Sequence, residues 1–387
     1  MIMRRVLYVQ YTNPAGYPPL EHSSQLLADA GWNVLFLGTG AFGANALRFP
    51  PYPSITVRQM RFCPAGWRQK LHYIQYSLWV LVWAIAWRPQ LIYASDPLAC
   101  PIALVLTLVP RLRVIYHEHD SPGTGTARRS SSGFKRLVGW TRNKLARRAK
   151  YCILPNEQRA ARFRQTTGRQ GDVLCVWNCP AEEEVLDERV SLDGPELWLL
   201  YHGSISPQRL PTAILEAMSK LPVSVKLRVI GYETVGSAGY LLEFQRVAQH
   251  LGISNRVQIL EAKPRRELLQ WCRKSDVGLM LIPTTSDDIN MQAMTGASNK
   301  VFDYLACGLA LLVPELPDWR ATFVEPGYGL ACLPNDPESI AVALRWLLDH
   351  PDEVRAMGKR GQRRVTTDWN YHKQFTPVLQ CLSQTIQ

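Results

Sequence analysis

The sequence predicts an α/β protein of two domains, each with a parallel sheet that is covered by helices on both faces. A chain of 387 residues with 47% apolar residues is too long for one ordinary hydrophobic core. Short apolar segments alternate with helix-like segments in both halves, which is typical of parallel sheets with crossover helices. The segment 178–196 between the two series is polar and acidic and contains two prolines, as domain boundaries do.

Ten short apolar segments are predicted to be strands, five in each half. In the first half they are Arg5–Gln10, Asn33–Leu37, Leu91–Ala94, Arg113–Tyr116 and Tyr151–Leu154. In the second half they are Leu197–Tyr201, Val225–Ile230, Val257–Leu260, Val277–Leu281 and Ala310–Val313. We expect domains at 1–185 and 186–368, and we expect the last segment, 369–387, to pack back on the first domain.

The net charge of +12 lies in the first half, because residues 1–185 hold 23 Lys and Arg against 10 Asp and Glu. This asymmetry indicates either an anionic partner or solubility alone. The longest apolar stretches, Leu78–Trp87 and Leu98–Pro110, are shorter than the roughly 20 residues that cross a bilayer. Nine cysteines without zinc-like spacing indicate reduced thiols, a cytoplasmic location and no metal site.

Gly38, Gly40 and Gly43 form the pattern G-x-G-x-x-G after a predicted strand, which in dinucleotide-binding folds holds a pyrophosphate. Three prolines within 50–53 prevent the helix that this motif requires. Residues 30–95 contain no Asp or Glu, so the acidic residue that binds the ribose is missing. We therefore interpret these glycines as turn residues.

The segment 296–308 is the most informative part of the chain. Ser298 suits the N-cap of a short helix, and the final glycine suits its end. The apolar residues of this helix share one side, while Asn299 and Asp303 lie on the other with Lys300 beside them. A helix N-terminus next to a lysine suits a diphosphate, and Asp303 suits the hydroxyls of a ribose. An ordinary solvated helix face is the alternative interpretation.

The strand 197–201 leads into a loop that ends at Arg209, and this loop favours the same kind of ligand. Gly203 allows the backbone to approach a ligand closely, and the planar guanidinium of Arg209 matches phosphate oxygens. A capped turn with a surface arginine is the alternative.

Polar groups also follow the fourth predicted strand of the first half, and ligands of open α/β sheets bind beyond the carboxyl ends of strands. His119 and Asp120 are therefore candidates to bind sugar hydroxyls or to move a proton. We expect His117 and His119 to face opposite ways and thus to form no joint metal site. Asn13 and Gly16 follow the first strand and are expected to line the cleft from the other side.

With these residues in place, the chain resembles the retaining family 4 of the GT-B glycosyltransferases. Residues 298–308 are similar to the family segment Pro-Asn-Lys-x-Phe-Glu-Tyr-x-Ala-x-Gly, and residues 201–209 are similar to its donor loop Gly-Arg-x-x-x-x-Lys. The resemblance implies two Rossmann-like domains facing across a cleft. It also implies transfer of a sugar from a nucleotide-diphosphate donor with retention of configuration, without metal or cofactor.

By this resemblance, Asp303 takes the position of the glutamate that binds the ribose of the donor. Thr295 and Gly296 lie where the family has its sugar-binding segment, and Thr295 replaces a glutamate. Ser298 and Asn299 complete the predicted donor site.

The resemblance also implies how charge is handled during transfer. Ser204 replaces a family arginine and Arg209 a family lysine, so Lys300 is expected to supply the missing positive charge. Arg209 and Lys300 then stabilise the departing diphosphate, which itself helps to deprotonate the acceptor. His119 orients the donor sugar, and the base of the donor lies against the strand ends near Tyr232 and Glu261–Lys263.

The stretch 128–150 holds nine Lys and Arg, no acid, and interleaved apolar residues. Together with the apolar segment 73–87, it suits the inner face of an anionic membrane and a lipid-linked or glycan acceptor. Cell-surface polysaccharide or glycolipid synthesis fits this setting. A helix that packs on its own sheet is the alternative.

Two other functions remain open at this stage. The basic half also suits a protein that binds nucleic acid or another polyanion, although no recognition motif or stacking series is present, so nucleic acid is not the expected partner. Thr295 and Ser204 are also compatible with a degenerate transferase that binds a sugar nucleotide without turnover.

Overall fold

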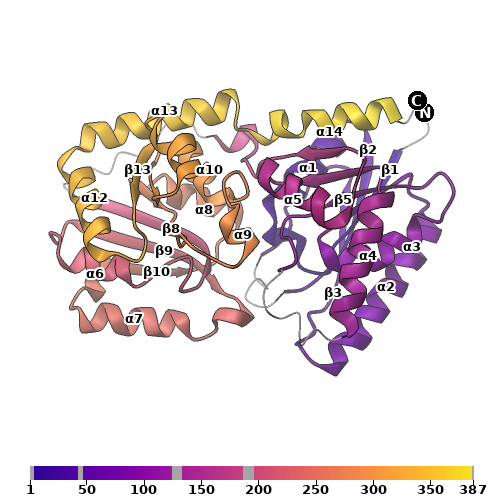
Figure 1. The fold of residues 1–387 in the computed structure, drawn as a ribbon, viewed down its shortest axis with the longest axis horizontal. Helices are drawn as coiled ribbons and strands as arrows, with labels where there is room; N and C mark the ends of the chain where they lie inside the picture. The colour runs from indigo at the N-terminus through magenta and orange to yellow at the C-terminus, as the bar shows by residue number, and fades with distance from the viewer. Residues whose placement is uncertain (1–3, 42–46, 124–132, 186–195, 386–387) are drawn as a thin grey trace. The chain divides into compact units, whose positions relative to one another are not determined.

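The computed structural model describes residues 4–41, 47–123, 133–185 and 196–385, and the chain forms two compact units (Figure 1). Unit 1 comprises Met1–Asn178, Asp287–Ala297 and Tyr371–Gln387. Unit 2 comprises Cys179–Ser286 and Ser298–Asn370. Each unit contains one parallel sheet, which confirms the predicted α/β fold class.

The described residues of unit 1 form a seven-stranded parallel sheet in the order β3-β2-β1-β4-β5-β6-β7. The strands are β1 (Arg4–Val9), β2 (Trp32–Thr39), β3 (Ile55–Met60), β4 (Leu91–Ser95), β5 (Arg113–His117), β6 (Tyr151–Leu154) and β7 (Val173–Cys175). The main helices are α1 (Pro18–Asp29), α2 (Trp67–Trp87), α3 (Cys100–Leu106), α4 (Gly133–Arg148), α5 (Glu157–Thr167), α9 (Ile289–Gln292) and α14 (Tyr371–Thr385).

Helices cover both faces of this sheet, because alternate strand residues feed two separate hydrophobic clusters. On one face, Leu7 and Val9 of β1 share a cluster with residues of α2, α3, α4 and α5. On the other face, Val6 and Tyr8 pack with α1 and with Phe375 of α14. The C-terminal helix α14 thus belongs to the core of unit 1.

The described residues of unit 2 form a six-stranded parallel sheet in the order β10-β9-β8-β11-β12-β13. The strands are β8 (Leu197–Ile205), β9 (Val225–Glu233), β10 (Val257–Glu261), β11 (Val277–Leu279), β12 (Ala310–Pro314) and β13 (Gly329–Cys332). The helices are α6 (Ala213–Ser219), α7 (Tyr240–His250), α8 (Arg265–Cys272), α10 (Asn299–Ala306), α11 (Pro317–Trp319), α12 (Pro337–Asp349) and α13 (Pro351–Thr367).

All ten predicted strands are present, and the three strands that were not predicted, β3, β7 and β13, lie at sheet edges. Edge strands bury less, so β3 has no continuous apolar run, while β7 and β13 are only three and four residues long. Several strand ends differ from the prediction, and one of them affects the site: β8 continues to Ile205, so Gly203 lies in a strand and pairs with Gly231 of β9, where a loop was expected.

Across the part of the chain that the structure describes, no helix combines the length and hydropathy that crossing a bilayer requires. The nine cysteines all lie in this part and form no disulfide.

The helix predicted within 298–308 is α10, and Gly308 ends it with a φ of +75°, a conformation that favours glycine. Helix α13 then crosses this end at backbone distance: a Cβ atom on Gly358 would lie 1.9 Å from the carbonyl oxygen of Gly308. The close crossing holds α10 against the rest of unit 2.

Gly358→Ala is expected to destabilise unit 2 by about 1–3 kcal/mol, because the new methyl group collides with a backbone carbonyl that has little room to shift. Gly139 in α4 is the matched control, since nothing lies within 4 Å of its Cβ position. Gly139→Ala should stabilise its helix by about 0.5–1 kcal/mol. Thermal unfolding followed by circular dichroism measures both, and a Gly358→Ala protein that melts no earlier than the wild type would contradict the packing argument.

Candidate functional site

Four of the predicted donor-binding residues come together at the carboxyl end of β8. Gly203 has a φ of +103°, and a Cβ atom there would lie 2.9 Å from Cε of Lys300. The Lys300 ammonium lies 5.7 Å from the centre of the Tyr201 ring, and the lysine is 9% exposed. Arg209 Nη1 donates to the hydroxyl of Ser204 at 3.0 Å. Two cations therefore lie at one strand end, an arrangement that suits phosphate binding.

Asp303 lies in the interior of unit 2, where it is 1% exposed. The alternative interpretation, an ordinary solvated helix face, is therefore wrong for Asp303 and Lys300, because both side chains are buried. Arg265 Nη2 donates to Asp303 Oδ1 at 2.8 Å, and the same guanidinium binds Glu184. Neither Arg265 nor Glu184 was recognised from the sequence.

His202 adds a neutral group to this network. Its Nε2 lies 3.4 Å from Asp303 Oδ2. Burial lowers the pKa of His202 well below its usual value, and the nearby cations Lys300 and Arg265 lower it further. The imidazole is thus uncharged near neutral pH, and Arg265 carries the charge that balances Asp303. Arg265 binds both carboxylate oxygens of Asp303 in this structure, and ribose binding by Asp303 stays a prediction.

At the start of α10, Ser298 stands at the N-cap with extended backbone, as predicted. Its hydroxyl does not cap the helix but points to Met280 Sδ at 3.9 Å. Asn299, the first residue of the helix, is half-buried.

Thr295 and Gly296 belong to unit 1, whereas the other predicted donor residues belong to unit 2. The Asn156 side chain donates to the carbonyl of Thr295 at 2.7 Å. The backbone N–H of Asn178 donates to the carbonyl of Gly296 at 2.8 Å, and a Cβ atom on Gly296 would lie 2.9 Å from the Trp177 ring. These contacts give both residues a structural part in unit 1, which their position in the sequence did not indicate.

Asp96 of unit 1, which the sequence analysis missed, organises the carboxyl ends of β4 and β5. Its φ of +65° is uncommon for a residue with a side chain and indicates local strain. Its Oδ1 accepts the backbone N–H groups of His119 at 2.9 Å and Asp120 at 3.4 Å. Burial raises the pKa of Asp96 to about 8, and the neighbouring carboxylate of Asp120 adds to this rise.

His119 is held at this strand end with its ring 6% exposed. Burial lowers the pKa of His119 to about 3, and the Arg159 cation contributes, so the ring is neutral. Among the described residues, neither ring nitrogen has a hydrogen-bond partner. A buried imidazole without partners is uncommon, and a ligand that supplies them is one explanation.

The prediction that His117 and His119 face opposite ways is wrong, since their ring centres lie 3.8 Å apart. Residues i and i+2 of an extended chain share one face, so the two rings lie on the same side. His117 is hydrogen-bonded through Nδ1 to the hydroxyl of Tyr93 at 2.7 Å. Within the described ranges, no three His, Cys, Asp or Glu side chains are grouped as metal ligands.

The other predicted cleft residues are Asp120 and, after the first strand, Asn13 and Gly16, and their surroundings differ. Asp120 is exposed, and its Oδ1 lies 3.8 Å from the Arg159 guanidinium. The Asn13 side chain accepts the N–H of Ala15 at 3.0 Å and an amide hydrogen of Gln59 at 2.9 Å. Asn13 therefore braces its own turn, while nothing lies within 4 Å of the Cβ position of Gly16.

Two glycines of the G-x-G-x-x-G pattern are explained by packing. A Cβ atom on Gly38 would lie 3.0 Å from the carbonyl oxygen of Thr12, and one on Gly40 would lie 3.0 Å from the backbone nitrogen of Phe62. Both contacts are tighter than most side chains allow. Gly43 lies outside the described residues.

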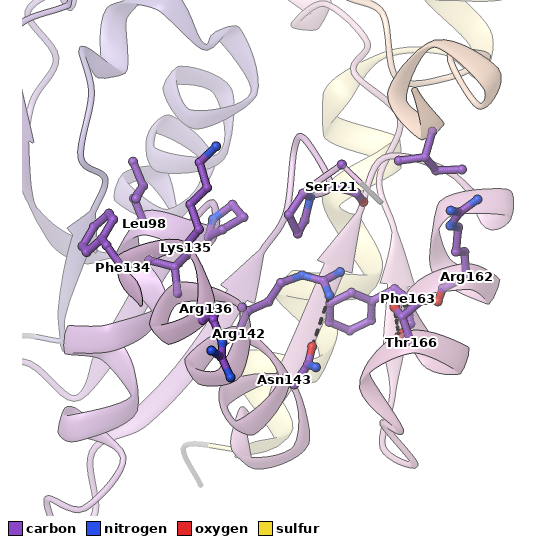
Figure 2. A pocket seen from close by; sticks show the side chains of 16 residues that line it. Leu98, Ser121, Phe134, Lys135, Arg136, Arg142, Asn143, Arg162, Phe163 and Thr166 are labelled. Atoms are coloured by element: carbon purple, nitrogen blue, oxygen red, sulfur yellow. Dashed lines mark hydrogen bonds between the residues drawn. The ribbon is translucent and has the colours of Figure 1, made fainter. Parts of the chain in front are cut away.

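Unit 1 contains a cavity of about 970 Å³ with basic residues in its wall. Figure 2 shows side chains of α4 on one side and of α5 on the other, with Arg142 between them. Arg142 is bound to the buried carboxylate of Glu118 through Nε at 2.5 Å and Nη2 at 2.7 Å. Lys135, Arg136 and Arg162 also line the cavity. The wall therefore suits an anionic group.

Comparison with known proteins finds two sequence families along the chain. Residues 20–179 match the family described as "Glycosyl transferase 4-like domain", and residues 209–380 match the family described as "Glycosyl transferase-like". Among solved structures, sucrose-phosphate synthase from Thermosynechococcus elongatus is similar, with a TM-score of 0.72 at 15% identity over 99% of both chains. Anabaena Alr3699/HepE, solved with UDP and glucose, gives a TM-score of 0.73 at 15% identity over 98% of this chain and 100% of that one.

The chain belongs to the GT-B glycosyltransferases. Its sequence relatives include D-inositol 3-phosphate glycosyltransferase 2 of Catenulispora acidiphila, which is 22% identical over 46% of this chain and 42% of its own length. The chain spans less than half the length of the inositol phosphate glycosyltransferases that it matches. The glycogen synthase of Mycobacterium tuberculosis strain H37Rv is 20% identical over 97% of this chain and 94% of its own.

These matches confirm the resemblance drawn from residues 201–209 and 298–308 and place the first half in the same group of enzymes. They favour neither a nucleic-acid-binding protein nor a degenerate sugar-nucleotide-binding protein.

The raised pKa of Asp96 predicts how the stability of this glycosyltransferase varies with pH. The folded protein retains the proton on Asp96 where the unfolded chain loses it, between the ordinary pKa of 3.8 and about 8. The contribution of Asp96 is therefore fully present below pH 3.8 and is lost as pH rises to about 8, with a slope of at most about 1.4 kcal/mol per pH unit.

Asp96→Asn is neutral at every pH and should remove this slope, which chemical denaturation at a series of pH values measures. Asp349→Asn, on an exposed helix end, is the control and should leave the slope unchanged. A slope that is equally steep in wild type and Asp96→Asn would show that Asp96 does not hold the proton.

Arg265→Met should destabilise unit 2 by about 3–5 kcal/mol, because it leaves the buried carboxylate of Asp303 without its cation. Adding Asp303→Asn to Arg265→Met should recover part of this loss, since the remaining buried group is then uncharged. Thermal unfolding of the two single variants and the double variant gives the interaction free energy between Arg265 and Asp303. Strictly additive effects on stability would argue against this ion pair.

Proposed function

We propose that the protein is a glycosyltransferase that moves a sugar from a nucleotide-diphosphate donor to an acceptor hydroxyl with retention of configuration. The observation that carries this proposal is the pair of cations, Lys300 and Arg209, near Gly203 at the end of β8. This arrangement matches a diphosphate, whose charge requires several positive groups in a site shielded from water.

Support for the donor class comes from the neighbour Alr3699/HepE, which was solved with UDP, with UDP-glucose, and with UDP and glucose. We propose a sugar nucleotide of this kind as the donor. Ser204 and the N-terminus of α10, with Ser298 and Asn299, provide further donors for its phosphates. Asp303 binds the ribose hydroxyls after Arg265 withdraws toward Glu184, with which it is already paired.

The proposed transfer breaks the bond between the anomeric carbon and the diphosphate oxygen, and the electron pair leaves with the diphosphate. Lys300 and Arg209 stabilise the charge that develops on this leaving group. The acceptor oxygen bonds to the anomeric carbon on the same face, and its proton passes to a diphosphate oxygen. No protein nucleophile, metal ion or cofactor takes part in this scheme.

His119 is proposed to bind a hydroxyl of the sugar. Because its imidazole is neutral, one ring nitrogen donates a hydrogen bond and the other accepts one, which matches a hydroxyl group. The contact satisfies ring nitrogens that have no partner among the described residues. Asp96 fixes the backbone of His119 and thereby its position.

We propose an anionic acceptor for the cavity of unit 1, because Lys135, Arg136 and Arg162 line it. The inositol phosphate glycosyltransferases among the relatives carry a phosphorylated compound in their name. A lipid-linked or glycan acceptor with a phosphate fits the same wall. The enzyme would then act in cell-surface polysaccharide or glycolipid synthesis, in the cytoplasm at the inner face of the membrane.

A panel of UDP-, GDP-, ADP- and TDP-sugars in a thermal-shift assay tests the donor site. One diphosphate class should raise the melting temperature, because a ligand at about 100 times its Kd stabilises the folded state by about 2.7 kcal/mol. Arg209→Ala should weaken that ligand about tenfold or more, the size expected when a hydrogen bond to a charged group is lost. Arg246→Ala, on the exposed face of α7, should not weaken it.

If the sugar nucleotide raised the melting temperatures of the Arg209→Ala and Arg246→Ala proteins equally, the donor would bind elsewhere. Release of the nucleoside diphosphate from the stabilising donor, followed over hours, then separates an enzyme from a protein that only binds. Stabilisation without any release would contradict the proposed transferase activity.

A further inference from the structure

Helix α2 is apolar on two opposite sides. One side packs into unit 1 and belongs to the cluster on that face of the sheet. Its buried residues are Tyr73, Tyr76, Val80 and Ala84. Two hydroxyls secure this side, because Tyr73 donates to the carbonyl of Leu98 and Tyr76 to that of Leu37, each at 2.8 Å. The helix is thus firmly held, and its other side is available to a partner.

The other side carries six large apolar side chains that are each more than half exposed, which we name the α2 stripe. These are Trp67 at 67%, Leu71 at 57%, Ile74 at 55%, Leu78 at 58%, Val82 at 61% and Ile85 at 67%. They recur every three or four residues, so they form one line along the helix. At 1.5 Å per residue, this line is about 27 Å long.

An exposed apolar surface of this extent is unusual, because the outer side of a surface helix is ordinarily polar. Contiguous patches of this kind mark interaction sites. Single exposed apolar residues need no such explanation, but six in register on one helix do.

The charges around the α2 stripe indicate what covers it. Arg68 lies on one flank of the stripe and Lys70 on the other, at about 80° from its centre on the helical wheel. Arg61 precedes the helix and Arg88 follows it, and both are exposed. No Asp or Glu occurs in residues 30–95 to balance these cations. The partner is therefore apolar at its centre and anionic at its edge.

We propose that the α2 stripe docks on an anionic lipid bilayer, with its apolar side chains among the acyl chains and Arg68 and Lys70 at the headgroup phosphates. Trp67, at one end of the stripe, suits the boundary between the acyl chains and the headgroups of the bilayer. A second copy of the chain fits less well, because two stripes facing each other bring like charges together.

Helix α4, which contacts α2, also carries exposed aromatic and basic side chains. Figure 1 shows α2, α3 and α4 side by side in unit 1, and the rings of Tyr73 in α2 and Phe134 in α4 are in edge contact at 5.0 Å. On α4, Trp140 is 56% exposed, and Lys144 and Arg147 are exposed. The sequence predicts membrane contact at the basic stretch 128–150 together with the apolar segment 73–87. The structure assigns the apolar contact to the outer side of α2.

Vesicle co-sedimentation tests this inference, which rests on the proposed work at a membrane face. The full chain should bind vesicles of phosphatidylcholine with about 30 mol% phosphatidylglycerol and bind pure phosphatidylcholine much less. Leu78→Gln/Val82→Gln should weaken binding about tenfold, because two apolar contacts with the bilayer are lost. Both changes lie on an exposed surface and should leave the melting temperature unchanged.

Val342→Gln is the matched control, since Val342 is 70% exposed on α12 of unit 2 and should not affect binding. Arg68→Glu/Lys70→Glu should lower binding to the anionic vesicles alone. Equal binding by the wild type and Leu78→Gln/Val82→Gln would overturn the proposal. It would also fall if the protein ignored vesicles but formed a dimer, seen in sedimentation velocity, that Leu78→Gln/Val82→Gln abolished.

The assay contains no donor or acceptor, so its failure is distinct from failure of the proposed transferase activity. If sugar nucleotides stabilised the protein but neither kind of vesicle bound it, the transferase proposal would stand and the membrane-docking proposal would be wrong.

Discussion

The donor-site end of unit 2 is organised around the buried carboxylate of Asp303. Removing a carboxylate from water costs several kcal/mol unless a cation and hydrogen bonds replace the lost hydration. Arg265 provides both, and it brings Glu184 into the same network. Helix α10 is thereby tied to the start of α8 and to the segment that enters unit 2. With α10 held in this way, Lys300 reaches the end of β8, where the proposed donor phosphates bind.

Glycines allow the backbone approaches on which this arrangement relies. A Cβ atom on Gly231 would lie 1.9 Å from the carbonyl oxygen of Gly203, and one on Gly278 would lie 2.1 Å from the Tyr304 ring. Strands β8 and β9 thus approach each other closely at Gly203 and Gly231, and the Tyr304 ring of α10 packs directly on the backbone of Gly278 in β11. Because Gly203 has no side chain, its backbone also lies next to the Lys300 side chain. The glycine therefore serves both the packing of unit 2 and the proposed binding of phosphates.

Unit 1 shows a different balance between stability and function. Asp96 holds a strained backbone conformation and a raised pKa, and both have an energetic cost. In return, the loop that carries His119 has a fixed backbone, and its ring remains without a protein partner among the described residues. Such features gather at binding sites, because a ligand supplies what the protein leaves unsatisfied. The α2 stripe is a larger example, because its exposed apolar surface is covered only when a partner binds.

The sequence by itself determined the alternation of strands and helices, the division into two halves and the residue types at the end of β8, because periodicity and turn chemistry are local properties. Gly203, Arg209 and Lys300 were found in this way. Only the tertiary structure decided which groups are buried and which are paired. The partners of Arg265 lie 38 and 81 residues away in the chain, and no local pattern reveals such a distance. Packing likewise decided which strands lie at the sheet edges. It also decided which side of α2 is exposed, since the sequence of an apolar helix does not show which side packs on the core.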